Sequence, residues 1–251
     1  MKGIPGIITE EGKYVERQVV TCYQSDALML LKPAAFMDIA QEIAFRAANV
    51  MGFGWDNLIP NDLAWVLTHM HFRYQGKVSW RDEITVSTWN RGPSGPFYMR
   101  DFRLEGENGS ILATSAWVLL NKESRTICRH SEVLENIPNA FQCDEAVLPG
   151  PVERIQFPAE AERRMAGEHT VGYSDIDMIG HTNNARYMVW AMECMDYDTL
   201  KDNCPKDVYI NFIHETKAGD KVALFRAKQG SSIFVEGKIA DAHVFSVRID
   251  Y

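Results

Sequence analysis

No stretch of this 251-residue sequence approaches the roughly 20 consecutive apolar residues that a membrane-spanning helix needs. The N-terminal region contains charged residues, Glu10, Glu11 and Lys13 among them, so it lacks the apolar core of a signal peptide. Basic residues are outnumbered by acidic ones, 26 to 34, and the net charge of -8 disfavours broad binding to nucleic acid or to anionic membranes. We therefore expect a cytoplasmic protein without a membrane span and without a nucleic-acid partner.

Cysteine is scarce, and its spacing excludes two kinds of site. The five cysteines are an odd number, lie far apart and form no CxxC pair, which excludes both a disulfide framework and a cysteine zinc site. The sequence predicts reduced thiols that are mostly buried. The five are Cys22, Cys128, Cys143, Cys194 and Cys204.

Motifs for metals and cofactors are also missing. Asp175, Asp177 and Gly180 have the spacing of a calcium loop, but the two further ligand positions hold Ile179 and Arg186. A second pair, the histidines at 69 and 71, shares one face of a predicted strand and lacks a third ligand. We expect neither a metal nor a cofactor.

What the sequence does contain is a folded core, with 46% apolar and 24% charged residues. In the N-terminal half, one Ala-rich segment has apolar residues at helical spacing and predicts a buried helix over Pro33–Val50. Strand-like runs surround it, with Gly, Asn or Pro at most of the breaks. These runs are 14–22, 64–74, 84–90, 98–104 and 111–121.

The same order of elements recurs after residue 166. The pattern predicts a strand over 169–174, a helix over about 183–197, and strands over 208–214, 221–228, 231–240 and 243–251. Proline-rich, acidic sequence between the two parts predicts an extended linker. We therefore predict an N-terminal domain over 1–135, a linker over 136–166 and a C-terminal domain over 167–251.

Two short echoes support an internal duplication. Tyr23, Ser25 and Asp26 before the first helix correspond to Tyr173, Ser174 and Asp175 before the second, and residues 80–84 correspond to 218–222. One apolar helix followed by four strands needs cover on several sides. The expected fold is α+β, a tandem (double) hot-dog in which each half is an antiparallel β-sheet wrapped around a central helix.

The loop that precedes the second helix, 173–184, carries two carboxylates, a histidine and two amides. Thr182, Asn183 or Asn184 can cap the helix, and free N–H groups there would stabilise negative charge on a thioester carbonyl under attack. Asp177 and His181 lie four residues apart, and a carboxylate and an imidazole suffice to activate water and protonate a departing thiol. For any one of these residues, a plain capping or loop hydrogen bond is the alternative interpretation.

Motifs along most of the chain resemble those of the acyl-acyl carrier protein thioesterases of plant plastids and bacteria, which are double hot-dog proteins. They are Trp65–Arg73, Trp80–Trp89, Met99–Phe102, Ser115–Lys122 with Arg125, Ser174–Asn184, Tyr187, Trp190 and His214 with Glu215. The resemblance implies hydrolysis of acyl thioesters, with acyl carrier protein as partner. It implies Asp177, His181 and Glu215 as catalytic residues.

Two positions depart from the family pattern. Ile179 stands where the family often has asparagine, so any role of that amide falls to backbone, water or another residue. Thr216 stands where plant members have cysteine, which excludes a cysteine nucleophile there. The residues leave open whether a carboxylate acts as base toward water or attacks the carbonyl directly, and whether His181 positions the substrate or moves the proton.

By the same resemblance the acyl tunnel belongs to the N-terminal half, where each buried methylene contributes roughly 0.8 kcal/mol. The predicted substrate-binding residues are Asn183, Asn184, Phe36, Ile39, Ile43, Met70 and Trp89, with core packing as the alternative for the last five. A basic patch that would dock the acidic carrier has Arg154, Arg163, Arg164 and Lys201 as candidates.

Three other functions fit the same fold. An acyl-CoA thioesterase shares the chemistry, a non-catalytic module would only bind the acyl ligand, and a dehydratase would use the helix start for proton transfer. The sequence leaves chain length and a homodimer open.

Overall fold

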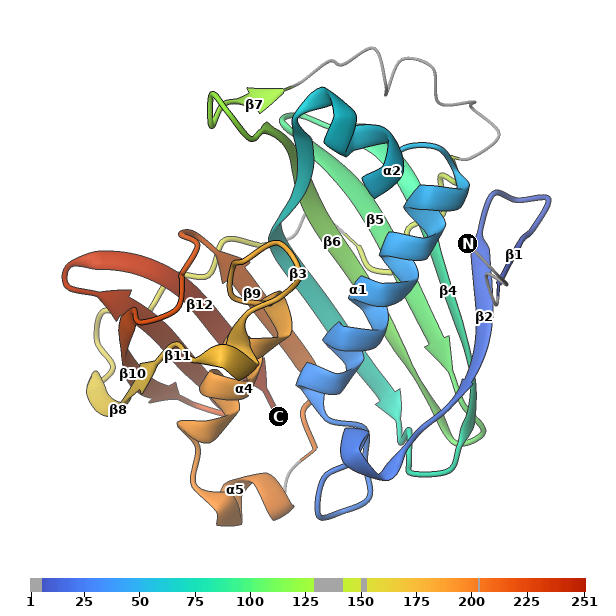
Figure 1. Cartoon of the computed structure of the whole chain (residues 1–251). Helices are drawn as coiled ribbons and strands as arrows, with labels where there is room; N and C mark the ends of the chain where they lie inside the picture. The colour runs from blue at the N-terminus through green and yellow to red at the C-terminus, as the bar shows by residue number, and fades with distance from the viewer. Residues whose placement is uncertain (1–5, 129–141, 150–152, 203) are drawn as a thin grey trace.

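The computed structural model describes residues 6–128, 142–149, 153–202 and 204–251 (Figure 1). The predicted linker thus lies partly outside the described residues. The helices are α1 (Pro33–Val50), α2 (Trp55–Leu58), α4 (Asn184–Glu193) and α5 (Tyr197–Asp202), and short 3-10 turns are η1 (Cys22–Gln24), η2 (Ile59–Asn61) and η4 (Tyr173–Asp175). The N-terminal strands are β1 (Ile7–Ile8), β2 (Tyr14–Val19), β3 (Leu63–Gly76), β4 (Glu83–Ser94), β5 (Phe97–Glu105), β6 (Gly109–Asn121) and β7 (Ile127–Cys128). The later strands are β8 (Arg164–Thr170), β9 (Asp207–Phe212), β10 (Lys221–Gln229), β11 (Ser232–Ile239) and β12 (Ala242–Asp250). Within the described ranges, no helix has the length and apolar character to cross a membrane.

All these strands belong to one antiparallel sheet. Its order is β1-β2-β4-β5-β6-β3-β9-β12-β11-β10-β8, and β7 pairs with β6 beside this path. The two halves of the chain meet where β3 pairs with β9, from His69 opposite Asn211 to Arg73 opposite Asp207. The sheet is therefore continuous from one half of the chain into the other (Figure 1).

Helix α1 packs on one face of the N-terminal strands (Figure 1). It begins at Pro33, whose fixed φ suits a first helical position, as predicted. Phe36, Ile39 and Ile43 are all at most 5% exposed, and the Phe36 ring lies 5.0 Å from that of Phe72 on β3. Core residues of α1, α4 and both parts of the sheet form one cluster, which explains how the second helix is held beside the first.

Several predicted boundaries in the C-terminal half were wrong. The strand expected over 169–174 is β8, Arg164–Thr170, because the Asp175 carboxylate accepts the Gly172 N–H at 2.8 Å and turns the chain. The helix expected to reach 197 ends at Glu193, and β9 ends at Phe212, so Glu215 lies in a loop. Of the five cysteines only Cys194 is buried, because the others lie on short surface elements and loops.

The loop before each helix has the same hydrogen bonds in both halves. Asp26 N–H donates to the Leu30 carbonyl at 2.9 Å, and Asp177 N–H donates to the His181 carbonyl at 2.9 Å. The Asp26 carboxylate accepts the Leu28 N–H, as the Asp177 carboxylate accepts the Ile179 N–H. The structural equivalent of Asp26 is therefore Asp177, and not Asp175 as predicted from the sequence. The predicted match was off by two residues because another aspartate, Asp175, lies close to the equivalent position.

The second echo is confirmed by its turn. Asp82 accepts the Ser79 N–H at 2.8 Å, and Asp220 accepts the Lys217 N–H at 2.8 Å. Each aspartate carbonyl then accepts the N–H of the residue directly after the strand that precedes the corresponding 3-10 turn, Val20 after β2 and Val171 after β8. The duplication thus extends from the loops to the turns that follow.

The repeated loop predicts opposite effects of glycine in its two copies. Met29 (φ 63°) occupies the left-handed position that Gly180 (φ 82°) occupies in the second copy. We expect Met29→Gly to raise the free energy of unfolding by about 0.5 kcal/mol and Gly180→Ala to lower it by about 1 kcal/mol, since only glycine adopts this backbone without strain. A Cβ on Gly180 would meet no atom within 4 Å, so a steric clash does not contribute. Urea unfolding measures both, and a lower midpoint for Met29→Gly would contradict the argument.

Candidate active site

The loop between η4 and α4 is held closed by its own backbone. Asp177 closes it at both ends, since its N–H donates to His181 and its carbonyl accepts the Gly180 N–H at 3.1 Å. The Ile179 N–H donates to Asp177 Oδ1 at 3.0 Å. Residue 179, which lacks the amide of the family pattern, therefore contacts the carboxylate through its backbone.

The side chain of Asp175 holds this loop against α4. Its side chain is 2% exposed, and it accepts hydrogen bonds from the Gly172 N–H, His169 Nε2 at 2.9 Å, Arg186 Nε at 3.1 Å and Trp190 Nε1 at 3.4 Å. Burial by itself raises the pKa of Asp175, but the Gly172 N–H, His169 and Arg186 together outweigh it and hold that pKa below its usual range. Asp175 is thus an ionised structural residue.

The Glu215 carboxylate lies near two side chains from different parts of the chain, Arg125 and His181. Its Oε2 lies 2.8 Å from Arg125 Nη2 and 3.7 Å from His181 Nε2. The Glu215 side chain is 30% exposed and that of His181 27% exposed, so both are open to substrate. The structure therefore brings together two of the predicted residues, Glu215 and His181. His181 belongs to the same loop as Asp177.

Residue 216 fixes the position of Glu215. Thr216 is fully buried, and its Oγ1 lies 2.7 Å from Thr182 Oγ1 and 2.9 Å from the Tyr187 hydroxyl. The Thr182 N–H also donates to the Thr216 carbonyl at 3.0 Å. The side chain of residue 216 thus ties the 215 loop to α4.

Helix α4 begins at the edge of this cluster. Asn183 is the N-cap, and its Oδ1 accepts the Ala185 N–H at 2.9 Å while its carbonyl accepts the Arg186 N–H. Within the described ranges, the Asn184 N–H has no acceptor. It and the positive end of the helix dipole are available to a carbonyl oxygen, as the sequence predicted for this helix start. The Asn184 side chain faces α1 and donates to Gln41 Oε1 at 3.2 Å.

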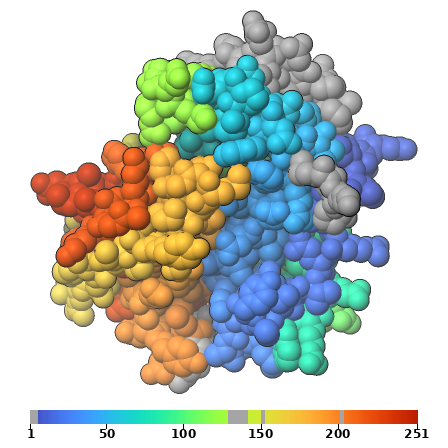
Figure 2. All heavy atoms as spheres, viewed as in Figure 1, coloured from blue at the N-terminus to red at the C-terminus, as the bar shows by residue number. Residues whose placement is uncertain are grey.

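A cavity of about 200 Å³ opens beside the same helix start. The loop before α4 contributes Asp177, Met178, Ile179 and Asn184 to its wall, and the other described wall residues come from the N-terminal half. That part of the wall is mostly apolar. It is formed by the α1 residues Gln41, Ala44, Phe45 and Ala48, by Phe53, Gly54, Trp55, Leu58, Ile59, Leu63, Ala64 and Trp65, and by Asn90, Tyr98, Met99, Arg100 and Trp117 of the sheet. In Figure 2 the orange segment of α4 and its loop meets the blue and cyan segments of α1 and α2. Most of this wall thus comes from the half of the chain to which the family resemblance assigned the acyl tunnel.

The five apolar residues predicted to contact substrate do not border this cavity. Phe36, Ile39, Ile43 and Met70 are core side chains, because their helix and strand faces point at the interior of the sheet. Trp89 is on the opposite face of the sheet, where its Nε1 donates to the Glu145 carbonyl at 2.8 Å. The neighbouring face of α1 lines the cavity instead. Asn183 serves as the helix cap, and of the two predicted asparagines only Asn184 borders the cavity.

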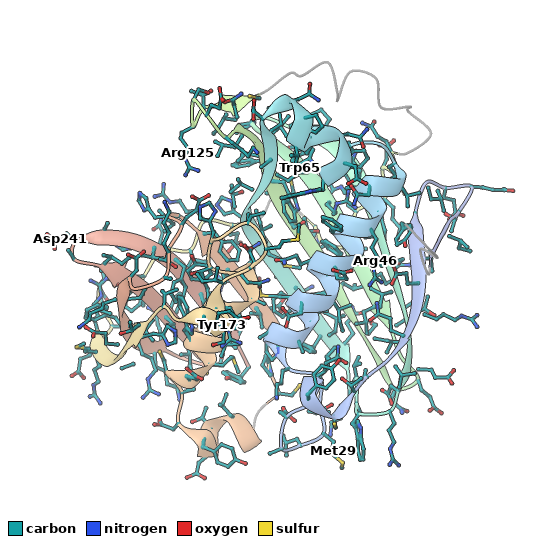
Figure 3. All side chains as sticks on the ribbon, viewed as in Figure 1. Met29, Arg46, Trp65, Arg125, Tyr173 and Asp241 are labelled. Atoms are coloured by element: carbon teal, nitrogen blue, oxygen red, sulfur yellow. The ribbon has the colours of Figure 1, made fainter. Side chains whose placement is uncertain are left out.

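Arg125 is the site residue that reasoning from the sequence did not assign. It lies in the turn between β6 and β7, on the side of the N-terminal half that faces the C-terminal half (Figure 3). Its backbone is left-handed (φ 56°), and its N–H donates to the Asn121 carbonyl at 3.0 Å. Strained backbone of this kind is concentrated at functional sites. The signal available in the sequence was the turn that begins at Asn121, because it ends at Arg125, a residue other than glycine.

We expect Arg125→Ala to lower kcat about tenfold while the stability of the fold changes by less than about 0.5 kcal/mol, since exposed ion pairs contribute little. The arginine acts through Glu215, so millimolar guanidinium should restore part of the lost rate. Lys221→Ala is the matched control, because Lys221 is another exposed cation paired with a glutamate, Glu168. Equal losses in both variants would show that the Arg125 pair has no special role.

Comparison with solved structures defines the class of fold. An acyl-ACP thioesterase from Bacteroides thetaiotaomicron superposes with a TM-score of 0.84 at 21% identity, covering 96% of this chain and 99% of that one. The 12:0-ACP thioesterase from Umbellularia californica gives 0.82 at 19% identity, covering 95% and 96%. The chain therefore has the hot-dog fold of these proteins.

The family follows from two family models. The acyl-ACP thioesterase N-terminal domain matches residues 11–137, and the acyl-ACP thioesterase C-terminal domain matches residues 159–244. The chain belongs to the acyl-ACP thioesterase family. A curated relative, the chloroplastic oleoyl-acyl carrier protein thioesterase of Coriandrum sativum, is 24% identical over 242 residues, 86% of this chain and 63% of the relative. The chain thus spans just under two thirds of the length of this relative.

Proposed function

We propose that this protein hydrolyses acyl thioesters of acyl carrier protein and releases free fatty acid and the carrier thiol. One observation carries the proposal: Asp177 and the Asn184 N–H border an apolar cavity, and His181, in the same loop as Asp177, lies 3.7 Å from Glu215 of the loop after β9. An acyl chain in that cavity would place its thioester carbon at the end of the wall where Asp177 lies, the one carboxylate among the described wall residues. The family membership of the chain and the names of its relatives support the same activity.

The roles divide by position. The thioester oxygen accepts the Asn184 N–H, so the helix start stabilises the negative charge that develops on it. Asp177, the carboxylate at the cavity, takes a proton from the attacking water. His181, paired with Glu215, gives a proton to the departing thiolate, and Arg125 keeps Glu215 in place.

The repeat supports catalysis in the C-terminal half alone. Equivalent hydrogen bonds from Leu31 to the Val78 carbonyl and from Thr182 to the Thr216 carbonyl align residue 77 with 215. The N-terminal copy therefore has Asp26, Leu30 and Lys77 where the C-terminal copy has Asp177, His181 and Glu215. It keeps the loop and lacks the imidazole and the second carboxylate.

This difference underlies a division of labour between the halves. In our proposal residues 1–135 form a hot-dog unit that holds the acyl chain, 136–166 link the halves, and 167–251 form the catalytic unit. Each unit wraps its part of the sheet around its own helix, α1 or α4. The contacts of both helices with one core cluster support this arrangement.

Acyl carrier protein is the proposed partner. Among the predicted docking residues, Arg163 pairs with Glu236 and Arg164 with Glu162, so their charges are locally compensated, and Arg154 is exposed. The side chain of Lys201 lies outside the described residues. The basic patch, a homodimer and a cytoplasmic location stay predictions, and the relative from Coriandrum sativum is named as chloroplastic.

The test is release of free thiol from a panel of acyl carrier protein thioesters of graded chain length, run beside the matching acyl-CoA thioesters. We expect turnover of the carrier thioesters with a higher kcat/KM than that of the CoA thioesters. Preference for CoA would assign the same chemistry to the other carrier. Tight binding without thiol release would identify a non-catalytic acyl-binding module.

A further inference from the structure

The wall of the cavity contains one buried cation without an anionic partner. Arg100 on β5 is 7% exposed and borders the cavity, and none of the described carboxylates forms an ion pair with it. Its guanidinium donates to one described side chain, from Nη1 to Thr88 Oγ1 at 3.2 Å, and lies 5.7 Å from the centre of the Phe53 ring. Burial lowers the pKa of Arg100 to about 10, so the group is still charged at neutral pH.

A second donor lies beside it. Asn90 is directly opposite Arg100 in the β4–β5 pair and borders the same cavity. Its Oδ1 accepts the Gly92 N–H at 3.1 Å, which fixes the orientation of the amide and leaves Nδ2 as the outward donor. Within the described part of the chain, Asn90 Nδ2 has no acceptor. The two side chains therefore present N–H donors, without an acceptor between them, in an apolar wall.

Donors without acceptors are costly in an apolar cavity. A hydrocarbon chain that fills the cavity would remove water from the Arg100 guanidinium and replace none of its hydrogen bonds. A chain that carries an oxygen atom at this point would supply the acceptor, and a charged donor makes that bond stronger than a neutral one. The outer-face arginine of the same strand, Arg103, shows the contrast, since Glu145 Oε1 lies 2.5 Å from its Nη2.

We propose that Arg100 and Asn90 form a subsite for an oxygen acceptor on the acyl chain, so that the substrates are acyl groups with an oxo, hydroxyl or carboxylate oxygen in their buried part. The proposal rests on the proposed function for the identity of the carrier. It adds a substrate class, oxygenated acyl chains, that the catalytic residues do not define.

The test measures binding and turnover separately. Non-hydrolysable thioether analogues of the acyl carrier protein substrate are prepared with plain chains and with chains of equal length that carry a 3-oxo group, a 3-hydroxyl, a mid-chain hydroxyl or a terminal carboxylate. We expect the wild-type protein to bind at least one oxygenated analogue about tenfold more tightly than the plain chain. Which analogue gains most identifies the source of the oxygen. A wild-type protein that binds the plain chain as tightly as every oxygenated one overturns the proposal and needs no variant.

Substitution then assigns the preference to the subsite. Arg100→Met should remove the tenfold preference and tighten binding of the plain chain, and Arg103→Met should keep the wild-type ratio. If Arg100→Met keeps the wild-type ratio, residue 100 does not recognise the oxygen. If the variant changes only the longest plain chain that binds, residue 100 limits chain length instead. Either result contradicts the proposal. Because binding is read without hydrolysis, absence of thiol release in the turnover assay would count against the proposed function and leave this test intact.

Discussion

Replacing Glu215 with glutamine should lower kcat for acyl thioester hydrolysis by about 10³-fold, the loss typical of a group that moves or supports a catalytic proton. Glutamine keeps the size of the side chain and removes its charge. His181 then loses the carboxylate 3.7 Å from its Nε2, and Arg125 loses its ion pair. Single-turnover rates of thiol release measure the effect. In our proposal the acyl chain binds in the cavity, which Glu215 does not border, so binding of the thioether analogues should be unchanged.

Asp177→Asn should cause a loss of similar size, because this carboxylate borders the cavity and the asparagine cannot accept the proton of water. The duplicated loop provides a matched control. Asp26→Asn makes the same change in the N-terminal copy, where the carboxylate accepts the same kind of backbone N–H. We expect wild-type turnover for Asp26→Asn. Full activity in both Asp177→Asn and Glu215→Gln would remove this site from consideration.

Another large effect is expected at Asp175, a residue that contacts no substrate. Asp175→Asn should lower the free energy of unfolding by about 2 to 3 kcal/mol, because the buried carboxylate that faces Arg186 and His169 loses its charge. The variant should also lower kcat by about 10- to 100-fold, since Asp175 joins the catalytic loop to α4 and a small displacement of catalytic groups is costly. Chemical denaturation and thiol release measure the two effects.

Glu193→Gln is the control for Asp175→Asn, as Glu193 is an exposed carboxylate on α4, the helix that Asp175 contacts. The pH dependence gives an independent check. The pKa of Asp175 is lowered in the folded state, so its charge stabilises the fold above the unfolded pKa, and this stability is lost as pH falls through the folded value. The stability difference between wild type and Asp175→Asn should be constant near neutral pH and shrink in acid. A difference that grows as pH falls would contradict the assignment.

Local patterns in the sequence were sufficient for most elements. Helix α1 has the predicted bounds, Pro33–Val50, because proline at its start and apolar residues at helical spacing act within the segment itself. The polar loop before α4 was also recognisable, since Asp177 and His181 stand four residues apart in it. The end of the strand before this loop was predicted wrongly because a buried aspartate, Asp175, accepts the Gly172 N–H and turns the chain after β8.

The chain by itself determined the duplicated order of elements, the polar loop before α4 and the family, because these depend on residue types and on spacings of a few positions. Only the tertiary structure decided which face of α1 borders the cavity, that Arg125 from one half contacts Glu215 in the other, and that Arg100 and Asn90 border the same mostly apolar cavity. Such relations depend on how elements that are separate in the sequence pair and curve, since β3 pairs with β9 of the other half and Arg125 reaches Glu215 across 90 positions. Packing between elements determines these relations, whereas the local sequence pattern determines the elements themselves.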